Sequence, residues 1–324
     1  MDPVCHTLVG AVLAESGLKK RTAYGTATLI IGANLPDIDV LSYLWGPVAA
    51  LAFRRGLTHG LLGLALLPLL LTGAVVVWHR LMSLRNDTPS SERLNPAWVL
   101  ALAYVSGVTH PLLDFLNVYG IRLLEPFSGR WFYGDTLFIV DPWIWLILGL
   151  GLVSARTKKS SSNGRSQRSG RSARRALAGA AIYVGVSAAI AFAARTEVLA
   201  QIGNPSEQHV RVMVAPVAVN PFSKFVVIED ADGYGFATLS LLGSQRLDSY
   251  NVRFAKGARN AAESTASRHP IVERFTTWSR FPYYASESRG EAWIVYVADA
   301  RYTLDPERSW AAVSVLVGDS RGDP

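Results

Sequence analysis

Long apolar runs without charged residues dominate the first two thirds of the chain. The clearest covers residues 61–78, between Arg55 and Arg80. At a rise of about 1.5 Å per residue, it is long enough to cross most of a hydrocarbon core of roughly 30 Å. Three further runs carry at most one ionisable residue each, and we predict that they also form membrane-spanning helices: residues 94–113, 136–155 and 176–194.

Two apolar runs near the N-terminus are interrupted or short. Residues 22–44 are apolar apart from Asp37 and Asp39, and Pro36 precedes these carboxylates, so we expect a span that is broken at the proline. Residues 3–17 are short for a full crossing, and we expect a short or re-entrant helix there. The predicted fold class is therefore a mainly α-helical membrane bundle of about five to six spans.

The pattern changes from about residue 208 to short apolar runs separated by Gly, Pro and Asp, which is typical of β-strands. We predict a small α+β domain in residues 195–324. Its expected strands cover residues 210–219, 224–229, 236–242, 292–297 and 310–317, and its expected helix covers residues 271–281.

Basic residues gather in residues 156–175, which hold eight Lys and Arg and no acid. Such a segment cannot form a core, and the positive-inside bias places it in the cytoplasm as a linker between the bundle of residues 1–155 and the span 176–194. Threading the chain from this anchor puts the loop 117–135 and the domain 195–324 outside the cytoplasm. The net charge of +7 is thus a topology signal. We expect no nucleic-acid partner.

The composition agrees with a membrane location, because half of the 324 residues are apolar and only 18% are charged. Residues 1–25 lack the basic segment that precedes the apolar core of a cleaved signal peptide, so we expect the first helix to be retained. Cys5 is the single cysteine, and we interpret it as a small buried residue. Any metal site must therefore use His and carboxylate ligands.

Ionisable side chains inside predicted spans are costly, which makes them candidates for function. In the expected topology all of these ionisable residues lie toward the outer membrane face, although the charge bias that set the topology did not use them. We therefore expect the functional site at the outer face of the membrane. The candidates are His6, Asp37, Asp39, His59, His110, Asp114 and Asp141.

His110 and Asp114 are four residues apart, a spacing that puts two side chains on one helix face about 5–6 Å apart. This is a usual way to present two ligands to one ion. Pro111 disfavours helical geometry at His110, so we predict a helix break there. Pro36 interrupts the chain in the same way beside Asp37, and broken helices at membrane depth occur where they line a cavity.

Several candidates have a structural alternative. A lone histidine such as His6 is as often a packing residue as a ligand. Asp39 fits a helix cap after Pro36, while Asp135 and Asp141 fit loop and cap positions. The remaining set is hard to explain by packing, so we favour a metal site for it: Asp37, His59, His110 and Asp114. His79, His209 and His269 have no such context.

Arg54 and Arg55 lie on the expected outer side, against the positive-inside bias. Guanidinium groups beside a metal site suit a phosphate-bearing substrate. Anchoring to lipid headgroups is an alternative of equal standing.

Four segments together resemble a known family: His6, residues 34–39 (NLPDID), residues 55–60 (RGLTHG) and residues 110–120 (HPLLDFLNVYG). They are similar to those of the bacterial membrane-bound metal-dependent hydrolases, some of which are LexA-regulated inner-membrane proteins. The resemblance covers roughly residues 1–150. The order of the ionisable residues is also similar to the ligand order of zinc-dependent phospholipase C.

The resemblance implies a divalent metal, zinc first and manganese second, held by His6, Asp37, His59, His110 and Asp114. It also implies a location in the bacterial inner membrane. The chain departs from the phospholipase pattern because it has no obvious further pair of His and Glu ligands after Asp114, so the resemblance does not extend to a full three-metal site.

Two functions compete. In the first, the protein hydrolyses an ester or phosphoester, plausibly of a membrane lipid, with Asp37 or Asp39 accepting the proton and Arg54 or Arg55 meeting the phosphate. In the second, the same residues bind or pass a metal ion without catalysis. Ligands near one face favour the hydrolase, since a transporter places them at the midplane. A passive membrane anchor leaves the cluster unexplained.

Overall fold

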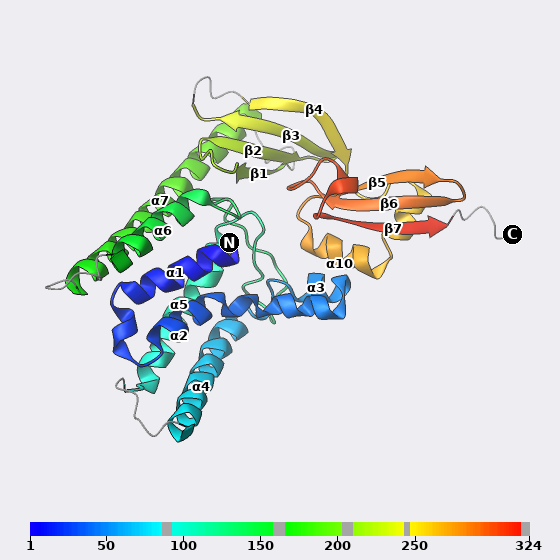
Figure 1. Ribbon diagram of the computed structural model, residues 1–324. Coiled ribbons are helices and arrows are strands. Elements are labelled where there is room, and N and C mark those ends of the chain that lie inside the picture. The colour runs from blue at the N-terminus through cyan, green and yellow to red at the C-terminus, as the bar shows by residue number, and fades with distance from the viewer. Residues whose placement is uncertain (86–92, 158–165, 203–209, 243–246, 319–324) are drawn as a thin grey trace. The chain divides into compact units, whose positions relative to one another are not determined.

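The computed structural model describes residues 1–85, 93–157, 166–202, 210–242 and 247–318 (Figure 1). The chain forms two compact units. The first, the helical unit, consists of Met1–Leu41, Phe53–Ala189 and Ala218–Pro221, and the second holds the rest of the described chain.

The helical unit is built mainly from apolar helices, with a long loop between α5 and α6. In chain order the elements are α1 (Pro3–Glu15), the 3-10 turn η1 (Leu18–Arg21), α2 (Gly25–Asn34), the 3-10 segment η2 (Leu35–Trp45), α3 (Pro47–Phe53), α4 (Leu61–Arg85), α5 (Pro96–Phe115), α6 (Pro142–Thr157) and α7 (Ser166–Ile202). Of these, α3, the end of η2 and the end of α7 belong to the second unit.

Helix α2 lies at the centre of the helical unit, against α1, α4 and α5. Ala14, Leu29 and Leu102 form the core where α1, α2 and α5 meet. Gly10 permits the close approach of α1 to α2, because a Cβ there would lie 2.6 Å from the backbone oxygen of Leu29. A separate core joins α1 to α6 and α7 around Cys5, Val12 and Leu148, among other residues.

Three helices in the described part of the chain are long and apolar enough to cross a membrane: Leu61–Arg85, Pro96–Phe115 and Gly170–Ile202. Helices α1 and α6 are apolar but shorter. The described residues therefore do not support the five to six spans expected from the sequence. Residues 136–155 do not form a helix of spanning length because α6 begins only at Pro142, after Asp141 caps it. Residues 22–44 do not form one because α2 gives way to 3-10 geometry at Leu35.

The helix break expected at Pro111 is wrong, since α5 runs unbroken from Pro96 to Phe115. The residue four positions earlier, whose carbonyl meets the proline ring, is Gly107, which adds no side chain to that turn. Pro68 lies inside α4 in the same way. Helices in a bilayer keep prolines where neighbouring helices and side chains compensate the lost hydrogen bond.

The second unit contains two antiparallel sheets. The first has the order β1-β2-β3-β4, and the second has the order β5-β6-β7. The end of α7 packs Ala194 and Val198 against Val212 and Val226 of the first sheet. The strands are β1 (Arg211–Pro216), β2 (Ser223–Glu229), β3 (Gly233–Ser240), β4 (Leu247–Ala255), β5 (Pro282–Arg289), β6 (Ala292–Asp299) and β7 (Ala312–Gly318), with α9 (Ala261–Ala266), α10 (Pro270–Trp278) and the 3-10 turn η3 (Pro306–Arg308) between them.

Each strand and helix expected in this region has a counterpart, but β4, β5 and α9 were not predicted. The sequences LDSYNVRFA of β4 and PYYASESR of β5 carry too many polar residues to stand out as apolar runs. Residues 158–165 of the basic linker lie outside the described residues, and so do residues 86–92 and His209.

Candidate metal centre

Helix α5 supplies two of the polar side chains in the helical unit's interior. His110 and Asp114 lie one turn apart, both fully buried, and the Nε2 of His110 is 3.2 Å from Oδ2 of Asp114. The continuous helix through Pro111 keeps the two side chains on one face, as their spacing predicts.

His59 joins this pair from the segment between α3 and α4. Its Nε2 lies 3.1 Å from the Nε2 of His110 and 3.3 Å from Oδ2 of Asp114. The three ligand atoms thus form a nearly equilateral triangle. Its edges match the separation of about 3.3 Å between two donors that each lie about 2.0–2.1 Å from a tetrahedral zinc ion.

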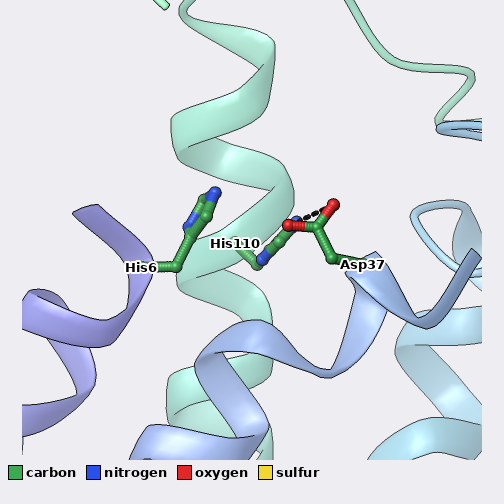
Figure 2. Close-up of side chains that lie close together, drawn as sticks. All are labelled: His6, Asp37 and His110. Carbon is green, nitrogen blue, oxygen red and sulfur yellow. Dashed lines mark ion pairs between the residues drawn. The ribbon is translucent and has the colours of Figure 1, made fainter. Parts of the chain in front are cut away.

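Asp37 and His6 complete the cluster from η2 and α1. Oδ1 of Asp37 is 3.7 Å from the Nε2 of both His59 and His110. The ring of His6 stacks on that of His110 with centroids 3.7 Å apart, and its Nε2 is 3.4 Å from Oδ1 of Asp114. Figure 2 shows His6 and Asp37 on either side of His110, with the ion pair to Asp37 dashed.

The five side chains make two overlapping groups of potential ligands. One consists of His59, His110 and Asp114, the other of His6, Asp37 and His110, and within each the ligand atoms lie within 4.8 Å of one another. The two groups share His110. A histidine with one free nitrogen serves one ion, so the two groups compete for it.

The hydrogen bond of Nδ1 determines which ring nitrogen of His110 is free to bind a metal ion. Nδ1 lies 2.7 Å from the backbone oxygen of Ala33, and a carbonyl can only accept, so Nδ1 donates and Nε2 presents a lone pair. His59 is held similarly, with its Nδ1 3.3 Å from Oδ2 of Asp39. Hydrogen bonding of the outer ring nitrogen to a carbonyl or carboxylate is the usual support for a metal-binding histidine.

A metal ion fits between the two rings. If Nδ1 of His59 donates to Asp39, the Nε2 lone pairs of the two neutral histidines face each other at 3.1 Å. A metal ion removes that repulsion, as does a proton on His59 or the other tautomer of His59, in which Nδ1 accepts from the hydroxyl of Thr58. His6 supports a metal, because neither of its buried ring nitrogens forms a hydrogen bond to the described part of the chain. Nitrogen and oxygen donors in this number fit zinc or manganese.

Asp39 lies behind His59 and belongs to neither group of potential ligands. Its Oδ1 accepts from Arg54 Nη1 at 2.8 Å, and its Oδ2 accepts from the backbone N–H of Arg55 at 2.7 Å. The carboxylate therefore has the geometry of an orienting group. The catalytic role predicted for it stays a prediction.

The two arginines both contact the acids of the centre. Arg55 is buried, its Nη1 is 2.8 Å from Oδ2 of Asp114, and its guanidinium lies over the ring of Tyr119. Arg54 pairs with Asp39. The α-amino group of Met1 also forms an ion pair with Asp114. The substrate-binding role of the arginines stays a prediction.

Other residues considered from the sequence lie outside the cluster. Asp141 caps α6, accepting from the backbone N–H groups of Trp143 and Ile144, and Asp135 lies in a loop with φ of 46°. His79 contacts Tyr24, and His269 caps α10. Cys5 is buried in the apolar core of α1, as expected.

Sequence reasoning missed the groups that hold the centre in place. The backbone oxygen of Ala33 leaves no trace in a sequence. Arg122 fastens the loop 117–135 to the arginine pair, since its Nη2 donates to the oxygen of Arg54 and its backbone N–H donates to that of Arg55. The Asn117 side chain, which accepts from the backbone N–H of Tyr119, could have been found from its place in the segment 110–120.

Apolar helices around a buried His and Asp cluster define a helical membrane protein with a candidate metal centre. Residues 1–197, which include the whole cluster, match the family described as YdjM inner membrane protein. The chain belongs to this family, because the match covers more than half of its 324 residues. No curated protein and no solved structure matches the chain.

Proposed function

We propose that this protein is a membrane-embedded, metal-dependent hydrolase that cleaves an ester or phosphoester, plausibly of a lipid, at the outer face of the bacterial inner membrane. The observation that carries the proposal is the triangle of Nε2 of His59, Nε2 of His110 and Oδ2 of Asp114, with edges of 3.1, 3.2 and 3.3 Å. Three protein ligands with a fourth position left for water or substrate are typical of catalytic zinc sites.

Each residue of the cluster has a distinct task in this reaction. His59, His110 and Asp114 hold the ion, while Ala33 and Asp39 fix the two imidazoles. A divalent ion bound there supplies a Lewis acid and a water of lowered pKa. Asp37 has 19% of its side chain exposed, whereas the three holding residues have none, so it lies on the open side of the centre.

That position suits Asp37 to accept the proton from the attacking water. Its Oδ1 lies at 3.7 Å from both histidine nitrogens, close enough to the ion to act through one water. Arg55 balances the charge of Asp114 and Arg54 that of Asp39, and in the proposed reaction these guanidinium groups also meet the phosphate. His6 stacks its ring on His110, and its ring nitrogens, which form no hydrogen bond to the described part of the chain, make it a further candidate ligand.

A second function competes: binding or transport of a metal ion without catalysis. The burial of the centre favours it, since His6, His59, His110 and Asp114 have no exposed surface. A substrate reaches a metal ion slowly when buried side chains enclose the ion on most sides. The two functions differ in whether chelator-sensitive turnover accompanies the bound metal.

The test measures metal content and turnover of the purified protein in detergent. We expect about one zinc or manganese per chain, and hydrolysis of a phospholipid or a nitrophenyl ester or phosphodiester that stops on chelation and returns with the ion. His110→Ala should lose both metal and turnover. His79→Ala, a histidine in α4 outside the cluster, is the matched control.

Tightly bound metal without chelator-sensitive turnover across these substrates would defeat the hydrolase. Metal flux into proteoliposomes, abolished by His110→Ala, would then establish the transport function. Equal metal content in the His110→Ala and His79→Ala proteins would remove the metal centre altogether.

A further inference from the structure

An uncharged stretch of chain leaves the metal centre and returns to it. Residues 40–53 lie between Asp39 and Arg54 and contain no charged residue. They form the end of η2, the turn at Gly46 and helix α3. Arg54 Nη1 lies 2.8 Å from Oδ1 of Asp39, so an ion pair joins the two ends of this segment, which we name the apolar loop.

The apolar loop exposes most of its large side chains. Leu44 and Trp45 are the most exposed of them, at 78% and 74%. A contiguous exposed apolar surface on a folded chain marks a contact with a partner or with a membrane. The exposed large residues of the loop are Val40, Leu41, Tyr43, Leu44, Trp45, Val48 and Phe53.

Membrane-type helices flank the apolar loop on both sides. Helix α2 ends at Asn34, shortly before the loop, and α4 begins at Leu61, shortly after it. The two helices pack against each other, and α4 is long and apolar enough to cross a membrane. Because both ends of the loop are tied to this bundle, the loop stays close to the bilayer.

The length of the apolar loop excludes a full crossing. Its fourteen residues would measure about 21 Å even as one continuous helix, which is short of a hydrocarbon core of roughly 30 Å. Gly46, with φ of 92°, also interrupts the helical path. Uncharged runs of this length are typical of buried helices or of re-entrant and interfacial segments, and the exposure of the loop excludes the first.

The chemistry of the apolar loop suits lipid better than a protein partner. Tyr43 and Trp45 are its exposed side chains with a polar group, and these two residue types are enriched where headgroups meet acyl chains. A protein interface would need more hydrogen-bonding groups. The turn satisfies its own backbone, since the N–H of Gly46 donates to Tyr43 and the N–H of Ala50 donates to Gly46.

We propose that the apolar loop lies in the lipid interface, with its exposed side chains at the boundary between the headgroups and the acyl chains. The partner is the bilayer surface itself. Asp37 lies three residues before the loop, in the same η2 segment, so the open side of the metal centre is held beside the lipid headgroups. The inference concerns where the centre opens, and it holds whether or not the centre is catalytic.

The test measures the depth of the apolar loop in protein reconstituted into phospholipid nanodiscs. After Cys5 is replaced, a nitroxide is attached to the Leu44→Cys protein, and its relaxation by oxygen and by water-soluble chromium oxalate is recorded. We expect effective relaxation by oxygen but about tenfold less by chromium oxalate than in water, because a charged reagent is excluded from apolar surroundings. The depth should be about 5–10 Å below the phosphates.

Two exposed leucines serve as references. Leu316→Cys, on β7 and 69% exposed, is the matched control outside the bundle, and Leu70→Cys, within α4 and 66% exposed, is the reference for the hydrocarbon core. Relaxation at position 44 by chromium oxalate as strong as at position 316 would place the loop in water. A depth equal to that of position 70 would make it a core segment, and protection from both reagents would indicate a protein partner. Each of these results overturns the inference.

A charged substitution tests whether the apolar side chains hold the loop in lipid. With the nitroxide at Val48→Cys, Leu44→Glu should raise relaxation by chromium oxalate about threefold or more, because a carboxylate is costly in apolar surroundings. Leu316→Glu, at an exposed position outside the loop, should leave the signal at position 48 unchanged. Equal signals in the two variants would show that lipid contact does not hold the loop, and the inference would be wrong.

Discussion

At the scale of single residues, the metal centre depends on the groups that hydrogen-bond to its histidine ligands. Ala33 and Asp39 decide which nitrogen of each histidine points inward, and neither is itself a ligand in the observed geometry. Support of this kind is worth about 10–100-fold in metal affinity in known metal sites. Asp39 is the one of the two that mutation can test, because a backbone oxygen such as that of Ala33 cannot be removed by substitution.

We predict that Asp39→Asn weakens metal binding by about 10–100-fold without abolishing it. The amide keeps the size of the side chain but weakens its hold on the Nδ1 proton of His59 and its ion pair with Arg54. Competition with a chromophoric chelator measures the affinity. Asp141→Asn, at the cap of α6, is the control and should bind normally.

An affinity of Asp39→Asn equal to that of the native protein would show that Asp39 does not position His59. A complete loss of metal at saturating concentration, as in a variant lacking a ligand, would instead make Asp39 a ligand. Both results differ from the intermediate affinity that the geometry implies.

At the scale of elements, the lengths of the apolar runs and the spacing of the ionisable residues predicted the two helices beside the metal centre well. Helices α4 and α5 were expected at residues 61–78 and 94–113 and lie at Leu61–Arg85 and Pro96–Phe115. The 3-10 geometry of η2 and the continuity of α5 through Pro111 could not be predicted. Both depend on contacts with neighbouring helices, which a local pattern does not contain.

The contact of α1 with α2 gives a prediction at this scale. Gly10→Val should lower the free energy of unfolding by about 1–3 kcal/mol, because overpacked interiors lose about that much. Its Cβ would lie 2.6 Å from the oxygen of Leu29 and 2.9 Å from Cα of Ile30, and backbone atoms do not yield cheaply. Displacing α1 also moves His6 away from His110.

Thermal unfolding in detergent measures the effect, with Gly73→Val as the control in an open position of α4. Metal content is read on the same samples. If both variants unfold at the same temperature as the native protein, the close approach of the two helices does not contribute to stability.

At the scale of the whole molecule, charge predicts how the chain crosses the membrane. The eight basic residues in 156–175 predict a cytoplasmic linker, and the apolar part of α7 follows it. We therefore predict that the sheets of the second unit lie outside the cytoplasm. The proposed function at the outer face depends on this predicted orientation.

Thiol labelling in intact cells tests the orientation. After Cys5 is replaced, Ser288→Cys should react with an impermeant reagent and Thr157→Cys should not, since both positions are exposed but lie on opposite sides of the expected span. Both should react after the cells are opened. Labelling of Thr157→Cys alone in intact cells would reverse the topology and place the centre at the cytoplasmic face.

The spread of the cluster along the chain has a consequence for biogenesis. Its residues run from His6 to Asp114, so three of the five, His6, Asp37 and His59, are synthesised before the two that α5 supplies. Buried ionisable groups without partners are costly in a bilayer. We therefore predict that the cluster forms only after α5 has inserted, because a chain stalled before His110 leaves Asp37 and His59 without the partners that α5 supplies.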